Sequence, residues 1–183
     1  KSTLLNLAAG LLEPTSGTIK FAEVESNRQP RMSIVFQETG LFPWRSVAEN
    51  VAFGLEAEGF PADKRKERIA HYIEPDILLM DEPFSALDAQ TRTIMQEELV
   101  TLWEKTRLTT LYVTHNIQEA VMLADRVVLL SRRPGKISKV LTINIPRADR
   151  DKPEHAEEIA EFIRIIWEHI SSDARAALME VND

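Results

Sequence analysis

The sequence predicts an α/β fold in which helices flank a mainly parallel β-sheet. Three short apolar or β-branched runs each end at polar residues, and they are predicted strands at residues 32–36, 77–80 and 109–114. Helices are predicted at residues 46–58, 61–74 and 89–107. Apolar runs bounded by chain-breaking residues are typical of buried strands in parallel sheets. Because ligands bind beyond the carboxyl ends of such strands, the polar residues that follow each run are the first candidates for a functional site.

The run at residues 77–80 is the most informative because two adjacent carboxylates, Asp81 and Glu82, follow it directly. Pro83 then interrupts the backbone, and a polar turn brings a third carboxylate, Asp88. An Asp-Glu pair by itself is best explained as two solvated acids at the end of a strand. The apolar strand, the proline and the Ser-x-Leu-Asp turn together favour a functional site instead.

Composition and charge exclude several classes of function. The 183 residues suit one domain with room for a small insertion, and 44% hydrophobic with 28% charged residues is ordinary for a globular chain. A net charge of −7 argues against a nucleic-acid partner, and the absence of cysteine excludes disulfides and cysteine-based zinc sites. No apolar run approaches the roughly 20 residues that cross a bilayer, so membrane association would require a partner protein.

The first residues fit the end of a phosphate-binding loop. Such a loop reads G-x-x-x-x-G-K-[ST] and leads into a helix, and the chain opens with Lys1, Ser2 and Thr3. The glycines are therefore expected upstream of residue 1. The apolar residues that follow have helical spacing, with one predicted face made of Leu4, Leu7, Ala8 and Leu11. A Lys-Ser pair alone also fits a frayed basic terminus on an ordinary core helix.

Several segments together resemble the ATP-binding subunits of ABC transporters. Residues 10–19 fit the pattern G-L-x-x-P-T-S-G-x-I at every fixed position, and residues 77–88 resemble the Walker B motif and D-loop. Gln37 is placed like the Q-loop glutamine, and residues 113–120 fit V-T-H-x-x-x-E-A around His115. Each motif is weak alone, but jointly they are specific over residues 1 to about 145. The motifs L-F-P-W and S-x-R-P-G-K-I are similar to segments of importers of nitrate, taurine and aliphatic sulfonates.

This resemblance implies a P-loop NTPase fold with ATP and Mg²⁺ as cofactors. Lys1 would contact the β- and γ-phosphates, Ser2 would ligate Mg²⁺, and Thr3 would bond the α-phosphate. Asp81 would hold Mg²⁺, and Glu82 would polarise the attacking water. Phosphoryl transfer depends mainly on positioning and charge neutralisation, which these residue types supply.

The resemblance assigns three further residues to the same chemistry. Gln37 would reach the Mg²⁺ shell and the attacking water, and His115 would bond the γ-phosphate. Asp88 would bind nucleotide across a dimer interface. The predicted catalytic residues are therefore Glu82, His115 and Gln37, and the predicted metal ligands are Ser2, Gln37 and Asp81.

The resemblance also predicts a nucleotide-binding domain with a gap, followed by a helical extension. Residues 1–153 would form the nucleotide-binding domain, and residues 154–183 a helical extension that begins with an amphipathic helix. The helical subdomain is incomplete because the sequence contains no Leu-Ser-Gly-Gly-Gln signature. We expect the missing segment near residues 74–75. It is disordered and left out, deleted, or lost in a degenerate relative, and the close match on both sides favours the first explanation.

The expected function is to hydrolyse ATP for a bacterial ABC importer of nitrate, sulfonate, taurine or a similar small anion. The chain would lie peripherally on the cytoplasmic face of the inner membrane. Transmembrane permease subunits would bind the Q-loop region, where the apolar residues 41–44 are either a protein contact or a local core plug. A second copy would complete a homodimer, a periplasmic solute-binding protein would act indirectly, and nucleic acid would not bind.

Two alternatives remain open at the sequence level. The first is a soluble, non-transport ABC ATPase of DNA repair or translation, against which the acidic charge counts. The second is a catalytically dead ABC-like binding domain. The missing signature supports the second alternative, whereas the intact Asp81, Glu82 and His115 oppose it.

Overall fold

The computed structural model describes residues 1–21, 30–37, 40, 42, 44–57, 59–61, 65 and 75–180. The chain divides into two compact units, each of which we describe by itself. The sheet unit comprises Ser2–Ala86 and Arg107–Val113, and the hairpin unit comprises Lys1, Leu87–Thr106 and Thr114–Asp183.

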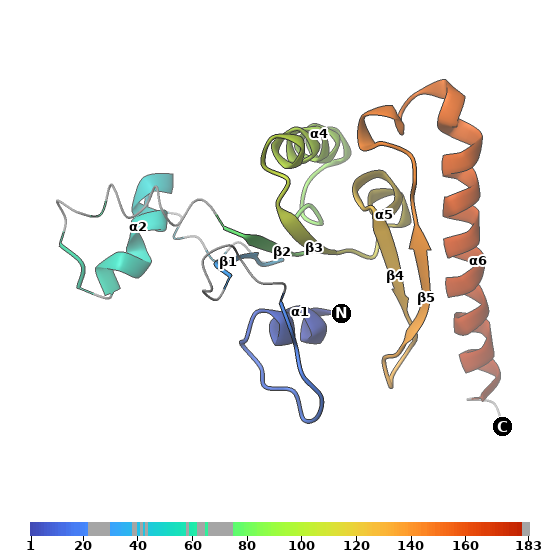
Figure 1. Ribbon diagram of the computed structural model, residues 1–183, viewed down its shortest axis with the longest axis horizontal. Coiled ribbons are helices and arrows are strands. Elements are labelled where there is room, and N and C mark those ends of the chain that lie inside the picture. Colours follow the sequence, from blue (N-terminus) through green and yellow to red (C-terminus); the bar gives the residue numbers. More distant parts are fainter. Residues whose placement is uncertain are drawn as a thin grey trace. The chain divides into compact units, whose positions relative to one another are not determined.

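The sheet unit is built on a parallel sheet with the strand order β1-β2-β3, so that β2 is central (Figure 1). Its strands are β1 at Met32–Val35, β2 at Ile77–Asp81 and β3 at Thr109–Val113. Both pairings are parallel and in regular register. The three predicted strands and their parallel arrangement are confirmed.

One short helix, α1 at Ser2–Ala8, packs against β2 and β3 in this unit. Leu5 is only 1% exposed and forms a buried cluster with Leu79 of β2 and Val113 of β3. The helix therefore supports the two strands whose ends carry the acidic pair and the histidine segment.

The predicted apolar face of this helix is wrong in part. Leu4 and Leu11 are exposed, and the core contact is centred on Leu5. The helix ends at Ala8 because Gly10 follows with a φ of 72°, a left-handed conformation that commonly terminates helices. The amide of Leu11 then donates to the carbonyl of Asn6 at 2.9 Å, which satisfies one of the last carbonyls of the helix.

A second helix in the sheet unit, α2 at Val47–Ala57, confirms the helix predicted at residues 46–58. It starts with a capping box, in which the Glu49 carboxylate accepts hydrogen bonds from the Ser46 amide and hydroxyl at 2.7 Å each. The amide of Glu49 donates to the Ser46 hydroxyl at 3.3 Å in return. The helix predicted at residues 61–74 lies outside the described residues except for residues 61 and 65.

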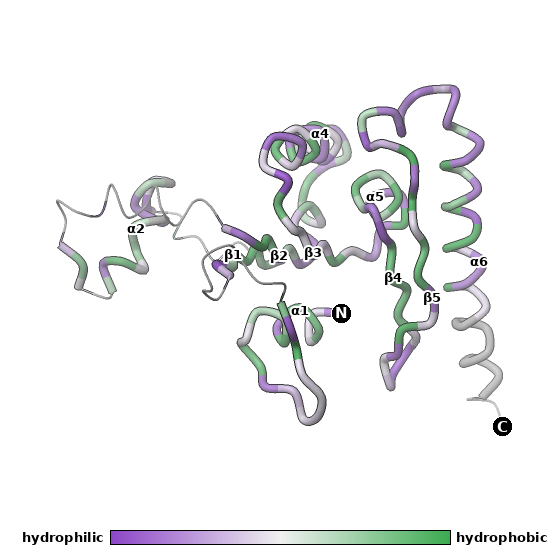
Figure 2. Tube along the Cα trace, viewed as in Figure 1, coloured by the Kyte–Doolittle hydropathy of each residue, from purple (hydrophilic) through white to green (hydrophobic). Residues whose placement is uncertain are grey.

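The hairpin unit combines helices with an antiparallel strand pair. It contains α4 at Ala89–Thr106, α5 at Ile117–Leu123, β4 at Arg126–Leu130, β5 at Ile137–Thr142, the short helices η1 at Arg147–Asp149 and η2 at Pro153–His155, and α6 at Ala156–Glu180. Hydrophobic and hydrophilic residues alternate along the described part of α6 (Figure 2). α6, which begins close to the predicted boundary at residue 154, packs against α5 within this unit. None of the described helices is long and apolar enough to cross a membrane.

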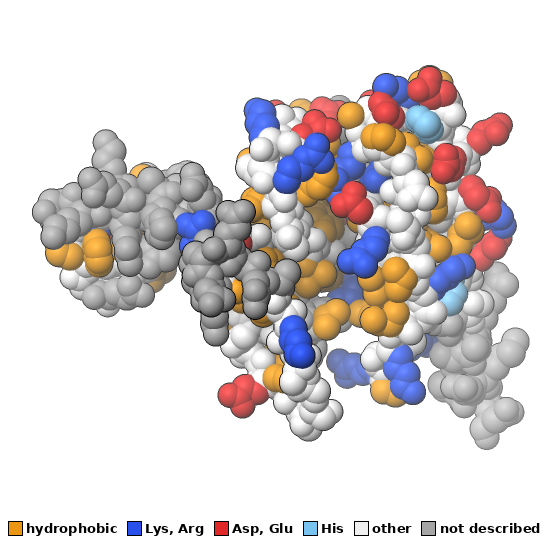
Figure 3. All heavy atoms as spheres, in the orientation of Figure 1, with side chains coloured by type: hydrophobic (Ala, Val, Ile, Leu, Met, Phe, Trp, Pro, Cys, Tyr) orange, Lys and Arg blue, Asp and Glu red, His pale blue; other side chains and the backbone are white. Residues whose placement is uncertain are grey.

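The core of the hairpin unit lies between α5, β4 and α6. Its buried members include Val121 of α5, Val127 and Leu129 of β4, and Ile159 and Ile166 of α6. Alternate residues of β4 point into this core, as expected for a strand with one buried face. On the face drawn in Figure 3, acidic and basic side chains are mixed with hydrophobic ones.

A buried arginine ties the end of α5 to the chain that follows β5. Arg150 is 3% exposed, and its guanidinium donates to the carbonyls of Val121, Met122, Ala124 and Ile145 at 2.9–3.0 Å. Burial, the main cause, lowers the pKa of Arg150 to about 10. The four hydrogen bonds that the guanidinium donates compensate the cost of burying this charge and fix the carboxyl end of α5.

Candidate functional site

The acidic pair and the predicted Q-loop glutamine lie at the same edge of the parallel sheet. Asp81 is the last residue of β2, and Val35 of β1 pairs with Met80 of β2. Gln37 and Glu82 therefore each lie two residues beyond this last pair, at the carboxyl ends of adjacent strands. Gln37 is exposed, and both carboxylates are partly buried. This edge is where α/β proteins bind ligands.

Glu82 has an unusual backbone conformation. Its φ is 48°, in the left-handed region that residues with a side chain rarely adopt. Hydrogen bonds hold it there, since its amide donates to the carbonyl of Val113 at 2.9 Å and its carbonyl accepts from the Ser85 amide at 3.1 Å and hydroxyl at 2.9 Å. Conformations of this kind cost roughly 1–3 kcal/mol and cluster at functional sites. The observed outlier supports a functional role for Glu82.

Two hydroxyl residues begin α1 in the sheet unit. Ser2 and Thr3 are exposed in the first turn of the helix, which packs on β2 and β3. Among the residues that the structure describes, no three His, Cys, Asp or Glu side chains gather as a metal site of their own. A hydroxyl, a carboxylate and an amide are nevertheless hard oxygen donors that suit Mg²⁺, which usually shares such ligands with substrate phosphates.

The remaining predicted site residues belong to the hairpin unit. The Lys1 ammonium donates to the carbonyl of Thr114 at 3.2 Å, so the structure brings Lys1 to the segment that carries His115. His115 is exposed and follows β3 by two residues.

Asp88 is the residue before α4, and its side chain caps that helix. Its carboxylate accepts hydrogen bonds from the amides of Gln90 and Thr91 at 3.1 and 3.0 Å and from the Thr91 hydroxyl at 2.7 Å. The hydrogen bonds from Thr91 are the main cause that lowers the pKa of Asp88. The sequence indicated a role for Asp88 at a dimer interface but did not reveal this cap.

The predicted site residues thus fall into two groups. Ser2, Thr3, Gln37, Asp81 and Glu82 belong to the sheet unit, and Lys1, Asp88 and His115 belong to the hairpin unit. The buried carboxylate of Glu119 in α5, which is 6% exposed, was not predicted as a site residue from the sequence. Its only sequence signal was that it is the Glu of the V-T-H-x-x-x-E-A pattern at residues 113–120.

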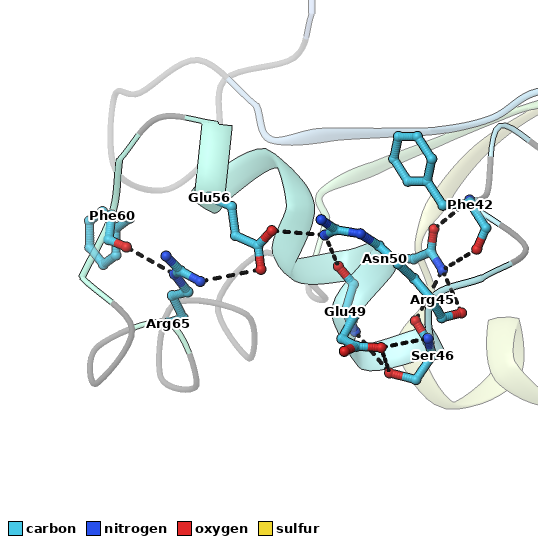
Figure 4. Close-up of polar contacts among 8 residues, drawn as sticks. All are labelled: Phe42, Arg45, Ser46, Glu49, Asn50, Glu56, Phe60 and Arg65. Atoms are coloured by element: carbon cyan, nitrogen blue, oxygen red, sulfur yellow. Dashed lines mark hydrogen bonds and ion pairs between the residues drawn. The ribbon is translucent and has the colours of Figure 1, made fainter.

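The loop after Gln37 is held together by one asparagine of α2. The Asn50 carboxamide accepts from the amide of Phe42 at 2.7 Å and donates to the carbonyls of Phe42, Arg45 and Ser46 at 3.0–3.2 Å (Figure 4). The Arg45 guanidinium also pairs with the Glu56 carboxylate at 2.8 Å. The described part of this loop therefore has a defined shape.

Aromatic side chains gather beside this loop. The ring of Phe42 lies 4.6 Å from that of Phe53 and 5.4 Å from that of Trp44, and Arg45 lies 5.1 Å from the centre of the Phe53 ring. Trp44 is 76% exposed and Phe53 is 41% exposed. We call these four residues the aromatic surface. Of the two explanations for this segment, the exposure of Trp44 favours a protein contact over a core plug. Residues 41 and 43 lie outside the described residues.

Comparison with known proteins identifies the family. The family model described as ABC transporter matches residues 1–74. The nitrate import ATP-binding protein NrtD of a Synechocystis species is 38% identical over 188 aligned positions, which cover 85% of this chain and 70% of that protein. The chain belongs to the ABC transporter ATP-binding proteins. The taurine import ATP-binding protein TauB of Yersinia pestis is also 38% identical to this ABC protein, over 79% of this chain and 69% of that protein.

A solved structure supports the same fold. The ATP-binding cassette MJ0796, a dimer in a post-hydrolysis state bound to ADP and Pi, superposes with a TM-score of 0.61 and 21% identity. The match covers 79% of this chain and 81% of that chain. The P-loop NTPase fold predicted from the sequence is therefore confirmed, and membership of this family makes the chain an ABC-type ATPase.

The alignment lengths reveal residues that the two import proteins have and this chain lacks. The NrtD alignment spans 188 positions, yet 85% of 183 residues is only about 156, so about 32 positions of NrtD have no counterpart here. The TauB alignment spans 177 positions against about 145 residues of this chain, again an excess of about 32. An ATP-binding protein of Brucella melitensis, 37% identical, shows an excess of only about 10, because its 177 positions cover 91% of this chain.

Proposed function

We propose that this ABC protein hydrolyses ATP to drive an importer of nitrate, a sulfonate, taurine or a similar small anion. The observation that carries the proposal is the acidic pair at the end of β2, where Glu82 is held in a strained turn beside the end of β3. The equal identity to a nitrate and a taurine import protein supports the anion class without favouring one solute.

In the proposed mechanism, the sheet unit supplies the hydrolytic groups. Ser2 and Asp81 offer oxygen ligands for Mg²⁺, which when bound neutralises charge on the phosphates. Thr3 donates to the α-phosphate, and Gln37 orients the attacking water. Glu82 accepts a proton from this water, a role worth roughly 10²–10⁴-fold in rate.

The hairpin unit supplies the groups that respond to the terminal phosphate. Lys1 adds a positive charge toward the β- and γ-phosphates, and His115 bonds the γ-phosphate. Asp88 meets nucleotide from a second copy of the chain in a homodimer. The N-cap hydrogen bonds of Asp88 hold it ionised, which suits a polar contact at such an interface.

The proposed membrane partner is a permease subunit that docks on the aromatic surface. Exposed aromatic and arginine side chains are enriched at protein interfaces, and Trp44 is the most exposed of the four residues of this surface that the structure describes. The loop that carries it begins directly after Gln37, so nucleotide-dependent changes at Gln37 would reach the permease. The periplasmic solute-binding protein acts indirectly through that permease, which keeps this ABC protein peripheral at the cytoplasmic face of the membrane.

A second candidate function is a nucleotide-binding scaffold that does not hydrolyse ATP. The missing signature wording and the excess of about 32 positions in both import proteins favour it. The family match ends at residue 74, which supports a missing segment at the predicted junction near residues 74–75.

Reconstitution of the full chain with its permease and solute-binding protein tests the proposal. We expect ATP hydrolysis that rises at least about tenfold when nitrate, taurine or an alkylsulfonate is supplied with the binding protein. Binding of ATP without hydrolysis under any of these conditions would support the scaffold instead. Co-purification with nucleic acid rather than permease would support the soluble, non-transport ATPase.

A further inference from the structure

A network of polar contacts in the hairpin unit links the segment before α4 to the segment that carries His115. Its centre is the buried carboxylate of Glu119. One oxygen of this carboxylate accepts the Thr114 hydroxyl at 2.7 Å, and the other lies 3.8 Å from the Arg92 guanidinium. Glu119 thus contacts α4 and the segment after β3 simultaneously.

At each end of this network, a hydrogen bond reaches the backbone of a candidate nucleotide-binding segment. The Arg92 guanidinium donates to the carbonyl of Leu87 at 2.8 Å, directly before Asp88. At the other end, the Thr114 hydroxyl accepts from the amide of Asn116 at 2.9 Å. Thr114 and Asn116 flank His115, so this hydrogen bond closes a tight turn around the histidine.

The Asn116 side chain extends the same connection into α5. Its carbonyl oxygen accepts from the amides of Gln118 and Glu119 at 2.9 and 3.2 Å, which makes Asn116 the N-cap of the helix. Glu119 therefore lies on the helix that starts at the histidine turn, and its carboxylate reaches back to Thr114. The turn and the helix are fixed by one set of contacts.

Because Glu119 is buried, this network should affect stability more strongly than a surface ion pair does. A carboxylate that is 6% exposed is costly to keep ionised unless hydrogen bonds and an opposite charge compensate it. Removing one partner leaves the other unsatisfied, so effects at one end should be felt at the other. An exposed pair, such as Arg164 with Glu168 at 2.6 Å on α6, lacks this constraint.

We propose that Arg92 and Glu119 are positioning residues that couple the Asp88 segment to the His115 segment. Through Arg92 the pair fixes the carbonyl before Asp88, and through Thr114 it fixes the backbone on both sides of His115. The functional meaning of this coupling rests on the proposed function, in which both segments contact ATP. The coupling itself is a property of the hairpin unit and requires no nucleotide.

Hydrogen exchange of the full chain without nucleotide tests the coupling directly. We expect Arg92→Gln to speed exchange about tenfold or more in residues 113–120 as well as in residues 85–92. Glu119→Gln should affect the same two segments, and the double variant should differ little from either single variant. The matched control, Arg164→Gln, breaks two exposed ion pairs, with Glu161 and Glu168, and should leave both segments unchanged. Faster exchange confined to residues 85–92 in Arg92→Gln would overturn the proposal.

A second pair of variants keeps the test valid if Glu119→Gln does not fold. Thr114→Ser retains the hydroxyl and should preserve slow exchange at the Asn116 amide. Thr114→Val removes the hydroxyl at similar size and should speed exchange there about tenfold. Equal exchange of the Asn116 amide in both variants would show that the hydroxyl does not hold the turn and would refute the proposed link.

The catalytic consequence has its own readout. Arg92→Gln should lower kcat for ATP hydrolysis at least about tenfold while changing KM less than threefold, and Arg92→Lys should restore part of kcat. A change in KM alone would contradict a positioning role. If the wild-type chain couples the two segments in exchange but hydrolyses no ATP, the proposed function fails and the coupling stands.

Discussion

At Glu82 the proposed chemistry requires a carboxylate, whereas the left-handed backbone conformation favours other residue types. The left-handed φ of 48° disfavours most side chains but is tolerated better by asparagine. We predict that Glu82→Asn unfolds at a higher temperature than Glu82→Gln, with a difference of about 0.5–1 kcal/mol in the free energy of unfolding. Thermal denaturation of both variants measures this. Equal stability would show that the turn is not strained.

Asp88 supplies a pH-dependent contribution to stability. Its folded-state pKa lies below the ordinary 3.8, mainly because Thr91 donates hydrogen bonds to the carboxylate. The contribution is therefore complete above pH 3.8 and is lost as the pH falls through the lowered pKa. Asp88→Asn keeps a capping side chain but cannot ionise. We predict that the stability difference between the wild type and Asp88→Asn shrinks as the pH falls from 6 toward 3. A difference independent of pH would contradict this cause.

Much of the candidate site could be predicted from the sequence, because its proposed chemistry depends on residues that lie in short motifs. Asp81 and Glu82 could be placed at a strand end since an apolar run precedes them, and the structure puts them there. The strained φ of Glu82 and the buried position of Glu119 could not be predicted. Both depend on contacts with segments distant in the sequence, such as the carbonyl of Val113 and the guanidinium of Arg92.

Among the elements, α6 buries residues of one face to different extents along its length. Ile166 is 1% exposed in the core of the hairpin unit, whereas Ile170, one turn later, is 45% exposed. We predict that Ile166→Ala lowers the free energy of unfolding by about 2–5 kcal/mol, because it opens a cavity. Ile170→Ala should cost less than about 1 kcal/mol, since surface substitutions change stability little. Urea denaturation compares the two variants, and equal losses would place the core of this unit elsewhere.

Helix faces were harder to predict than strands. The runs that became β1, β2 and β3 were located within a residue or two, because strands are short and bounded by breakers. For α1 the sequence offered several leucines at helical spacing, and only tertiary packing selects Leu5 over Leu4. A helix of seven residues buries so little surface that its neighbours decide its orientation.

For the whole molecule, the aromatic surface predicts where the permease binds. Trp44→Ala should weaken co-purification with the permease at least about tenfold, since exposed aromatic residues are frequent hot spots. Trp167→Ala is a matched control, because Trp167 is 62% exposed on α6 and lies away from the Q-loop in sequence. ATP binding should be unchanged in both variants. Equal weakening by the two variants, or none by Trp44→Ala, would remove the aromatic surface from the interface.

We propose that this ABC protein hydrolyses ATP with Glu82 as the base that activates water. The most direct test measures Mg²⁺-ATP binding and steady-state hydrolysis by the full chain as wild type and as Glu82→Gln. We predict equal nucleotide affinity and a fall in hydrolysis of about 100-fold or more in the variant. Equal hydrolysis by both proteins, or a wild-type chain that does not bind Mg²⁺-ATP, would contradict the account.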